Sequence, residues 1–205
     1  MFYKSIFKRV IDFLLSTIGM LILFPVFLII YLTLYFLNDK KVFFYQIRPG
    51  LNEKLFKIIK FRTMNDKKDN NGILLPDIQR VTRFGRVLRK TSLDEIPQLI
   101  NVFKGDMSLV GPRPLLPQYL PFYTKREKLR HSVRPGITGY AQINGRNNLG
   151  WDDRLEMDAK YTEKITLFFD IKILLKTILN VIQRKDVVII SSEYNTTTLD
   201  YYRSK

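Results

Sequence analysis

The sequence predicts a mainly helical α+β protein, in which a re-entrant N-terminal membrane helix over residues 1–38 is joined to one domain at the membrane interface. The chain is uncharged and strongly apolar from residue 13 to residue 37, and uncharged apolar runs of about 18 or more residues are candidates for membrane insertion. Residues 39–190 combine short strand-like stretches with stretches of helical period, which is enough for one domain. Residues 191–205 are polar and predict a tail.

Pro25 interrupts the apolar run near its middle. A proline inside a helix removes one backbone hydrogen bond and clashes with the preceding turn, so it kinks or breaks the helix. The helix can therefore span the bilayer with a kink, or enter, turn at Pro25 and leave on the side from which it came. Basic residues lie on both flanks: Lys4, Lys8, Arg9, Lys40 and Lys41. Because cytoplasmic flanks of membrane segments are rich in Lys and Arg, the re-entrant arrangement is favoured.

The composition points to an anionic partner and limits the chemistry. The chain has 34 basic and 19 acidic residues, a net charge of +15, which suits nucleic acid, acidic lipid or a phosphorylated substrate. With a membrane segment present, phospholipid headgroups and a phosphate-bearing substrate are favoured over nucleic acid. The absence of cysteine excludes disulfides, zinc thiolates and a cysteine nucleophile, and the single histidine, His131, excludes a metal site with several histidines. A metal would be a hard cation held by carboxylates, which indicates Mg²⁺.

The first elements of the domain are a hairpin and two helices. Residues 42–44 and 55–61 predict its strands, with a turn at residues 48–50. Residues 65–77 are polar and predict a loop. Residues 78–90 have helical period, with Val81, Phe84, Val87 and Leu88 on one side. Ser92 is expected to open the next helix, which runs to about residue 103.

The second half of the domain alternates loops and helices. Residues 111–121 contain four prolines and cannot be helical throughout, whereas a short helix is plausible around residues 117–131. Loops are expected at 134–136 and 144–146, and helices at 151–163 and 167–183. The last of these is either a core helix or lies in the membrane interface. The tail after residue 190 is expected to fray.

Ser92, Asp94 and Glu95 form the sharpest local pattern. A Ser followed three residues later by Glu is a capping box, which would satisfy two amides at a helix start, and acidic residues are ordinary in a first turn. Two adjacent carboxylates exceed what a cap requires, however. They follow a segment, residues 80–90, with five basic residues and no acid. Such a pair beside arginines is a plausible site for a diphosphate with Mg²⁺, in which one carboxylate attacks phosphorus.

Further basic residues are candidates for phosphate contact. Arg113 is fixed between two prolines, Lys60 and Arg62 flank Phe61, and Arg146 lies in a predicted loop. Exposed basic side chains on a strand or loop are common, so Lys60, Arg62 and Arg146 each have a solvated alternative. We expect His131 and Asp158 at the surface as well, whereas Asp170 stands out because it interrupts an apolar run.

Several segments together resemble the small monotopic phosphoglycosyl transferases, a family of bacterial sugar transferases. The matching segments, in order, are KRVID at residues 8–12, the proline-split run, FFYQIRPG at 43–50, FKIIKFRTM at 56–64, RKTSLDEIPQLINVFKGDMSLVGPRPL at 89–115 and RPGITGYAQINGR at 134–146. One departure is Phe24-Pro25, where family members often carry Ser-Pro. The resemblance extends over about residues 8–180, and it is close to the diacetylbacillosamine-phosphate transferases and to the transferases that initiate exopolysaccharide and capsule.

The resemblance implies a reaction and roles for individual residues. Asp94 would attack the sugar-bearing phosphate of a UDP-sugar, which releases UMP and leaves a covalent phosphosugar that undecaprenyl phosphate then attacks. Glu95, with Asp94, would hold Mg²⁺ or assist the acceptor phosphate. Arg89, Arg113 and Arg146 would contact phosphate or nucleotide. The domain would be catalytic and lie on the cytoplasmic face of the bacterial inner membrane, and a homodimer stays open.

Two other functions are compatible with parts of the sequence. A non-catalytic basic membrane module could bind anionic lipid and recruit a glycosyltransferase, although the intact carboxylate pair argues against it. A membrane-tethered nucleic-acid binder is supported by charge alone, because aromatic residues are not interleaved with the arginines beyond Phe84. The sequence does not name the sugar.

Overall fold

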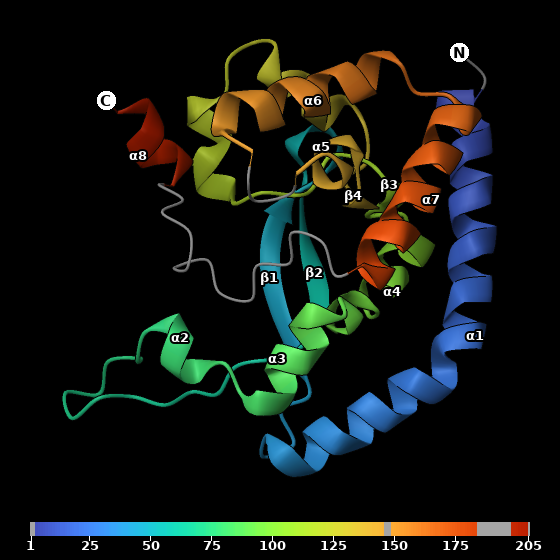
Figure 1. Ribbon diagram of the computed structural model, residues 1–205. Coiled ribbons are helices and arrows are strands. Elements are labelled where there is room, and N and C mark those ends of the chain that lie inside the picture. Colours follow the sequence, from blue (N-terminus) through green and yellow to red (C-terminus); the bar gives the residue numbers. More distant parts are fainter. Residues whose placement is uncertain (1–2, 146–148, 184–197, 205) are drawn as a thin grey trace.

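The computed structural model describes all residues except 1–2, 146–148, 184–197 and 205 (Figure 1). A π-helical turn, Tyr3–Phe7, leads into α1, Lys8–Leu37. Then follow β1 (Phe43–Pro49), β2 (Leu55–Phe61), α2 (Asp77–Arg80), α3 (Arg83–Lys90), α4 (Gln98–Lys104), β3 (Ser108–Val110), β4 (Gly136–Thr138), α5 (Tyr140–Ile143), α6 (Trp151–Glu163), α7 (Leu167–Ile182) and α8 (Leu199–Arg203). Short 3-10 turns cover Leu51–Glu53, Leu93–Glu95, Pro117–Phe122 and Glu127–Ser132. The fold is mainly helical and α+β, as predicted, and the described residues also form a second small sheet, β3–β4, that was not predicted.

Helix α1 is one long helix with Pro25 inside it, and Figure 1 shows it bent sharply into two arms. A proline removes one backbone hydrogen bond of a helix and thereby favours such a bend. The helix is long and apolar enough to cross a membrane, with a mean hydropathy of 2.7. Only 11% of its most apolar 18-residue stretch is buried. Outward-facing side chains such as Leu21 and Ile22 are 72% and 70% exposed. An apolar face of this extent indicates membrane association.

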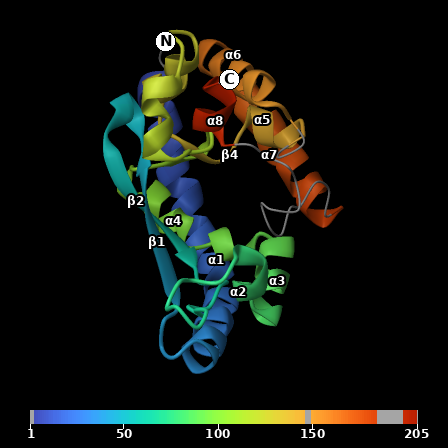
Figure 2. The same cartoon turned by 90° about the vertical axis from the view of Figure 1, so that its left-hand side faces the viewer.

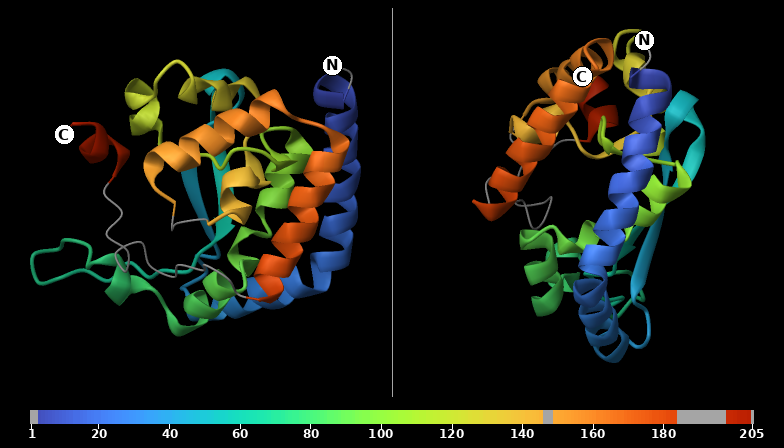
Figure 3. Two further views of the ribbon diagram at one scale, coloured as in Figure 1. Left: turned by 45° about the horizontal axis from the view of Figure 1, so that its top comes forward. Right: turned by 90° about the vertical axis from the view of Figure 1, so that its right-hand side faces the viewer.

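The N-terminal arm of α1 is tied to the domain by polar contacts. Lys8 donates to Asp170 across 2.6 Å, and both side chains are nearly inaccessible. Asp170 also accepts hydrogen bonds from the hydroxyls of Tyr3 and Tyr161, each at 2.7 Å. Figures 1 and 3 show the resulting arrangement, with α7 alongside this arm. The polar residue that interrupts the apolar run of α7 therefore anchors the membrane helix.

The predicted hairpin is confirmed, but its turn lies later than expected. β1 and β2 pair antiparallel, with Phe44 opposite Lys60 and Arg48 opposite Phe56. The chain reverses after Gly50, where Asn52 adopts the left-handed conformation at φ 52°, which asparagine tolerates better than most residues. Arg48 is consequently a strand residue and not part of the turn, so its side chain is held on a defined face of the hairpin.

The predicted helix over residues 78–90 is two helices, α2 and α3. Val81 leaves helical geometry to pair with Met64, and Thr82 then caps α3 by accepting from the Gly85 amide at 2.9 Å. Gly85 packs so closely on Thr63 that an added Cβ would lie 2.1 Å from a backbone oxygen. This contact fixes α3 against the end of β2. In this arrangement Val87 points outward and is 52% exposed, although it was expected on the apolar side of the helix.

Helix α4 holds the hairpin from the other side. The buried Asn101 accepts from the Ile59 amide at 3.1 Å and donates to the Lys57 carbonyl at 2.9 Å. The core here contains Ile58, Val102 and Met107. Helix α4 therefore holds the middle of β2, and α3 packs just beyond its C-terminal end at Thr63, which fixes the position of the short turn between these helices.

Two predictions for the second half of the chain are wrong. Residues 117–131 form two 3-10 turns instead of a helix, because Pro117 and Pro121 cannot supply helical amide donors. Part of the predicted polar tail is ordered as α8, where Leu199 is fully buried and packs in a cluster with Tyr119 and Leu155. The predicted helices at 151–163 and 167–183 are confirmed as α6 and α7.

Figure 2 shows how these elements surround a central space, with the hairpin along one side, α6 and α7 on the opposite side, and α3 below. The parallel pair β3–β4 lies between them. Gly111 and Gly136 permit its close approach, since a Cβ on either would lie within 2.5 Å of the opposite backbone. The fold thus brings residues from both halves of the chain around one space.

Candidate active site

Asp94 and Glu95 lie in the 3-10 turn Leu93–Glu95, between α3 and α4. The predicted capping box does not form. Ser92 is in the left-handed conformation, at φ 57°, and makes no side-chain cap bond, while α4 begins only after Pro97. The expectation that Ser92 opens the helix that runs to about residue 103 is therefore wrong. The pattern that resembles a cap instead presents two carboxylates on a tight turn.

Glu95 is held by two cations. Its Oε1 atom accepts from Lys60 Nζ at 2.7 Å and from an Arg113 guanidinium nitrogen at 2.7 Å. The second oxygen, Oε2, has only a long contact of 3.5 Å to Arg113. Burial opposes the ionisation of Glu95, but the charges of Arg113 and Lys60 outweigh it and hold the pKa of this carboxyl well below its usual range. Glu95 is therefore ionised and fixed in position.

Asp94 differs from its neighbour. The side chain is buried, it borders the central cavity, and no ion pair or hydrogen bond to it is found among the described residues. Burial, and then the charge of Glu95, raise the pKa of Asp94 to about 6, against the opposing effect of Lys60, Arg113 and Arg89. At neutral pH Asp94 is mostly an ionised carboxylate, and no cation among the described residues is bound to it.

The carboxylate pair borders a cavity of about 830 Å³, which is within the range of small-molecule sites. The structure brings to its wall most of the residues predicted from sequence: Lys60, Arg62, Arg89, Asp94, Glu95 and Arg113. Arg146 lies outside the described residues. The hairpin supplies Lys60, α3 supplies Arg89, and the Pro-Arg-Pro turn supplies Arg113, so the cations converge from three separate elements.

The cations of this wall are held in different ways. The Arg89 Nε donates to Thr63 Oγ1 at 2.9 Å, and burial lowers the pKa of Arg89 despite the nearby Asp94. Arg62 donates to the exposed Asp66 at 2.9 Å. Arg89 therefore lies close to the carboxylates, whereas Arg62 belongs to the outer edge of the cavity.

A second basic group borders the same cavity and was not predicted: Arg48, Arg130 and Arg154, with Asp158. Arg130 donates to Asp158 at 2.9 Å and to the Arg113 carbonyl at 2.6 Å. The side chains of Arg130 and Asp158 are 1% and 3% exposed. The expected surface position of Asp158 is thus wrong, since α6 turns it inward to pair with Arg130.

His131 is likewise buried and not solvated as expected. Burial lowers its pKa to about 4, helped by the charge of Arg130, so it is neutral at physiological pH. It packs against Tyr123 and does not border the cavity. A structural role follows, since neither its charge nor its position serves the carboxylate pair.

The wall opposite the cations is formed by neutral polar groups from β4, α5 and α7. Thr138 and Thr177 share a hydrogen bond of 2.7 Å, and Gln142 and Asn180 lie beside them. The Gln142 Oε1 atom is buried and lacks a hydrogen-bond partner among the described residues. A cavity with one cationic wall and one neutral polar wall suits a ligand that has both phosphates and hydroxyl groups.

The donor set at the carboxylate pair suits Mg²⁺ if the substrate supplies further oxygens. Among the described residues no group of three or more His, Cys, Asp or Glu could hold a metal. Both oxygens of Asp94 and the Oε2 atom of Glu95 are available, and Mg²⁺ is typically bound by one or two carboxylates, waters and substrate phosphates. The residues therefore fit an ion that arrives with a phosphorylated ligand.

Comparison with known proteins agrees with this geometry. Residues 3–184 match the family described as bacterial sugar transferase. The chain is 50% identical, over 86% of its length and 88% of the relative, to the Bacillus subtilis (strain 168) protein named uncharacterized sugar transferase EpsL. It is 38% identical to the exopolysaccharide production protein ExoY of Rhizobium meliloti (strain 1021), over 83% of each chain.

A third relative has a named reaction. The chain is 40% identical to the UDP-glucose:undecaprenyl-phosphate glucose-1-phosphate transferase of Escherichia coli (strain K12), over 85% of this chain and 40% of the relative. The matched segment contains the hairpin, the carboxylate turn and the Pro-Arg-Pro turn, since it takes in most of the chain. These relatives do not favour a non-catalytic membrane module.

Proposed function

This chain belongs to the bacterial sugar transferase family, and on that basis we propose that it moves a sugar 1-phosphate from a UDP-sugar to undecaprenyl phosphate and releases UMP. The substrate classes are those in the name of the Escherichia coli relative. The product would be the first lipid-linked intermediate of a polysaccharide or other glycoconjugate. The observation that carries the proposal is the ion-paired Glu95 next to the unpaired, cavity-facing Asp94.

In the first step, a carboxylate oxygen of Asp94 attacks the phosphorus that bears the sugar. A bond forms between that oxygen and phosphorus, and the bond from phosphorus to the bridging oxygen of the diphosphate breaks, so UMP leaves with the bonding electrons. Asp94 suits this role because no cation among the described residues forms an ion pair with it and its pKa of about 6 leaves it ionised at pH 7. Carboxylate nucleophiles that form covalent intermediates are an established mode of catalysis.

In the second step, an oxygen of undecaprenyl phosphate attacks the same phosphorus. The bond from phosphorus to Asp94 breaks and the free carboxylate returns. Dividing the transfer in this way lets one cavity accept a soluble donor and a lipid acceptor in turn. No water need take part, and the buried position of Asp94 protects the acyl phosphate from hydrolysis.

Lys60 and Arg113 fix the charge around the reacting phosphate. Both bind Glu95 Oε1 at 2.7 Å, and both border the cavity, so their remaining donors can reach phosphate oxygens. Preorganised cations of this kind stabilise charge that develops during phosphoryl transfer. Arg89, held by Thr63, would contribute in the same way from α3.

Mg²⁺ would be held by Asp94 and Glu95 Oε2 together with oxygens of the diphosphate. When bound, it would neutralise charge on the diphosphate and favour departure of UMP. The contribution of the chain is to keep Glu95 ionised and fixed in position, which Lys60 and Arg113 do by binding Oε1.

The membrane helix would place this site at the cytoplasmic face of the inner membrane. The bend at Pro25 and the basic residues on both flanks support a re-entrant path, with both ends of α1 on one side. Backbone carbonyls freed by a proline need partners inside a membrane. The hydroxyl groups of Thr17 and Thr33 donate to backbone carbonyls one turn earlier in the same helix. These hydroxyl groups are therefore hydrogen-bonded within the apolar helix.

The test is UMP release by the purified full chain in nanodiscs with undecaprenyl phosphate, Mg²⁺ and a panel of UDP-sugars that includes UDP-glucose. We expect release from at least one donor, loss of release with EDTA and recovery with added Mg²⁺. Arg89→Gln should slow release strongly, whereas Arg86→Gln, an exposed position on the same helix, should not. Absence of release from every donor would refute the proposed reaction.

A further inference from the structure

We propose that Arg48, together with Arg113 and Arg154, binds the phosphate of the nucleotide half of the donor, at the end of the cavity farther from the membrane helix. This inference rests on the proposed use of a UDP-sugar. It divides the cavity into two phosphate subsites. The sugar-bearing phosphate would lie at Asp94, and the phosphate that leaves with the nucleoside would lie at Arg48.

The hairpin places Arg48 on the cavity side. Phe44, Gln46 and Arg48 alternate along β1, so they share one face of the sheet with Lys60, which is opposite Phe44. All four residues border the cavity. Arg48 is four residues farther along the strand, roughly 14 Å at about 3.4 Å per residue. The same surface therefore carries a cation at the carboxylate pair and another well beyond it.

Arg113 connects these two positions. It binds Glu95 at 2.7 Å, and its positive charge is close enough to contribute to the lowered pKa of Arg48. Pro49 and Gly50, directly after Arg48, line a small internal gap together with Arg113 and its flanking prolines. A diphosphate that reached from Asp94 toward Arg48 would pass Arg113 on the way.

Arg48 has no counter-charge of its own among the described residues. Within the part of the chain that the structure describes, its guanidinium has one hydrogen bond, a donation to the neutral Gln46 Oε1 at 2.6 Å. Burial, and then the charge of Arg113, lower the pKa of Arg48 to about 10. Arg48 is partly buried; removing a cation from water without an acid beside it is unfavourable, and a bound anion would reduce that penalty. Bidentate binding of phosphate is a characteristic use of arginine.

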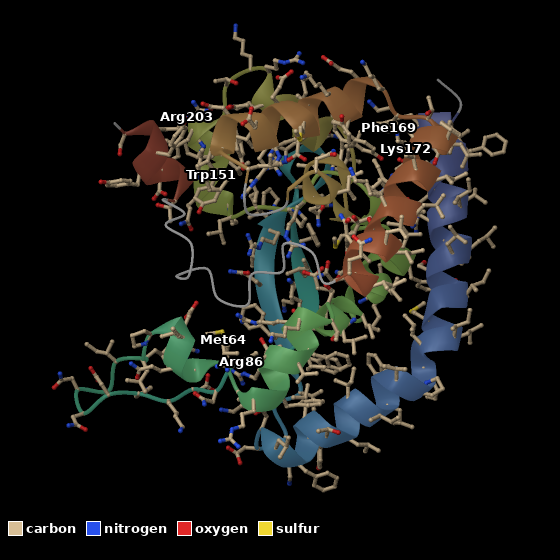
Figure 4. The ribbon with its side chains drawn as sticks, viewed as in Figure 1. Met64, Arg86, Trp151, Phe169, Lys172 and Arg203 are labelled. Carbon is tan, nitrogen blue, oxygen red and sulfur yellow. The ribbon has the colours of Figure 1, made fainter. Side chains whose placement is uncertain are left out.

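Arg130 provides the contrast within the same cluster. It is as close to the cavity as Arg48, but Asp158 neutralises it at 2.9 Å and Tyr123 and the Arg113 carbonyl occupy further donors. The structural arginine of this cluster, Arg130, is thus paired with an acidic side chain, unlike Arg48 among the described residues. Arg154, which stacks over the Trp151 ring at 4.9 Å, reaches the cavity from α6, and Figure 4 shows Trp151 at the start of that helix.

The position of Arg48 favours a soluble nucleotide over the lipid acceptor. β1 begins beside the C-terminal arm of α1, where Phe43 packs against Phe27 and Tyr31, and runs away from that arm (Figure 1). A polyprenol phosphate is tethered to the membrane and enters from the side of α1. The far end of the strand is the end that a water-soluble donor can occupy without competing for that entrance.

The test is UMP binding by the full chain in nanodiscs, measured by isothermal titration calorimetry. Arg48→Gln should weaken UMP binding roughly tenfold or more, because hydrogen bonds to charged groups are the strong ones, and Arg48→Lys should lie between. The matched control is Lys57→Gln, an exposed residue of β2 whose ammonium lies over the Tyr45 ring, which should leave UMP affinity unchanged. Thermal unfolding of each variant verifies that it is folded.

Steady-state kinetics separate the two phosphate sources. Arg48→Gln should raise the KM for the UDP-sugar and leave the KM for undecaprenyl phosphate within about twofold. A rise in the KM for the lipid alone, equal UMP affinity in wild type and Arg48→Gln, or no UMP binding by wild type would each overturn the assignment. Absence of turnover with every donor would instead refute the proposed reaction, and UMP binding that still depended on Arg48 would then support a nucleotide subsite by itself.

Discussion

Asp94 and Glu95 are adjacent in one 3-10 turn, yet only Glu95 is ion-paired. Glu95 Oε1 lies 2.7 Å from both Lys60 and Arg113, whereas Asp94 faces the cavity without such a partner among the described residues. Their pKa values move apart for that reason: burial raises that of Asp94 to about 6, and the two cations hold that of Glu95 low. Paired groups with opposite shifts are typical of sites that divide chemical roles.

The first prediction is that neutralising the two carboxylates has opposite effects on stability. Asp94→Asn removes a buried charge, so at pH 8 it should stabilise the fold by about 1–3 kcal/mol, at about 1.4 kcal/mol per pKa unit. Glu95→Gln leaves Lys60 and Arg113 without their acid and should destabilise by about 2 kcal/mol, a low value because Arg113 is partly exposed. Thermal unfolding in nanodiscs should show shifts of roughly 2–4 °C per kcal/mol.

The sign of the Asp94 effect also depends on pH. Its pKa is raised on folding, so the folded chain holds this proton more tightly, and the penalty is present above pH 6 and fades between pH 6 and pH 4. The gain from Asp94→Asn should fade over the same interval. A variant that unfolds at pH 8 would mean that the turn needs the aspartate for its structure.

The second prediction concerns the pH dependence of turnover. The nucleophile must be ionised, and the free enzyme's kcat/KM reports its pKa. We expect kcat/KM to fall below pH 6 and to reach about a tenth of its plateau at pH 5, in line with the raised pKa of Asp94. Glu95 and His131 should not contribute, since both keep one protonation state above pH 5. A decrease in kcat/KM centred near pH 4 would contradict a raised pKa of Asp94.

The third prediction concerns the anchor of α1. Lys8→Met leaves Asp170 as a buried unpaired charge and should destabilise the protein by about 3 kcal/mol. The control is Lys41→Met, which removes an exposed pair with Asp66 at 3.2 Å and should change stability by less than about 1 kcal/mol. Adding Asp170→Asn to Lys8→Met should restore part of the loss in a double-mutant cycle. Equal effects of the two lysine variants would mean that the buried pair is not an anchor.

The fourth prediction concerns the path of α1. Pro25→Leu restores the missing backbone donor and should straighten the helix into a span, which moves the N-terminus to the other side. Because the chain has no cysteine, Lys4→Cys and, as a fixed reference, Lys41→Cys can be labelled with an impermeant maleimide. With Pro25 in place, we expect both cysteines to be protected from the maleimide. In the Pro25→Leu background, we expect the cysteine of Lys4→Cys to be labelled and that of Lys41→Cys to stay protected. Unchanged labelling would mean that flanking charge, not the proline, sets the topology.

Local sequence patterns predicted most of the carboxylate wall, because its residues lie in short segments next to one another in the chain. The failure at Ser92 is instructive. The Ser-to-Glu spacing has the form of a capping box, but the Glu95 side chain is taken by Lys60, 35 residues away. A local pattern does not reveal that a distant cation outcompetes a backbone amide.

The second basic group could not be predicted for a related reason. Arg48 was placed in a turn, because Pro-Gly follows it, whereas the chain reverses later, at Asn52 and Glu53, which both have positive φ. Asp158 is one of several charged residues on α6, and its inward direction depends on Arg130 from a separate 3-10 turn. Of the arginines between residues 80 and 90, Arg80 and Arg89 border the cavity, whereas Arg83 and Arg86 are exposed.

The most direct test of the central claim is the intact mass of the protein after UDP-sugar and Mg²⁺ are added without undecaprenyl phosphate. The account predicts that wild type gains the mass of one sugar phosphate, that Asp94→Asn gains none, and that added undecaprenyl phosphate removes the gain. Peptide mapping should place the adduct on Asp94. Turnover by wild type with no adduct under rapid quenching, or an adduct that persists in Asp94→Asn, would contradict the assignment of Asp94 as the nucleophile.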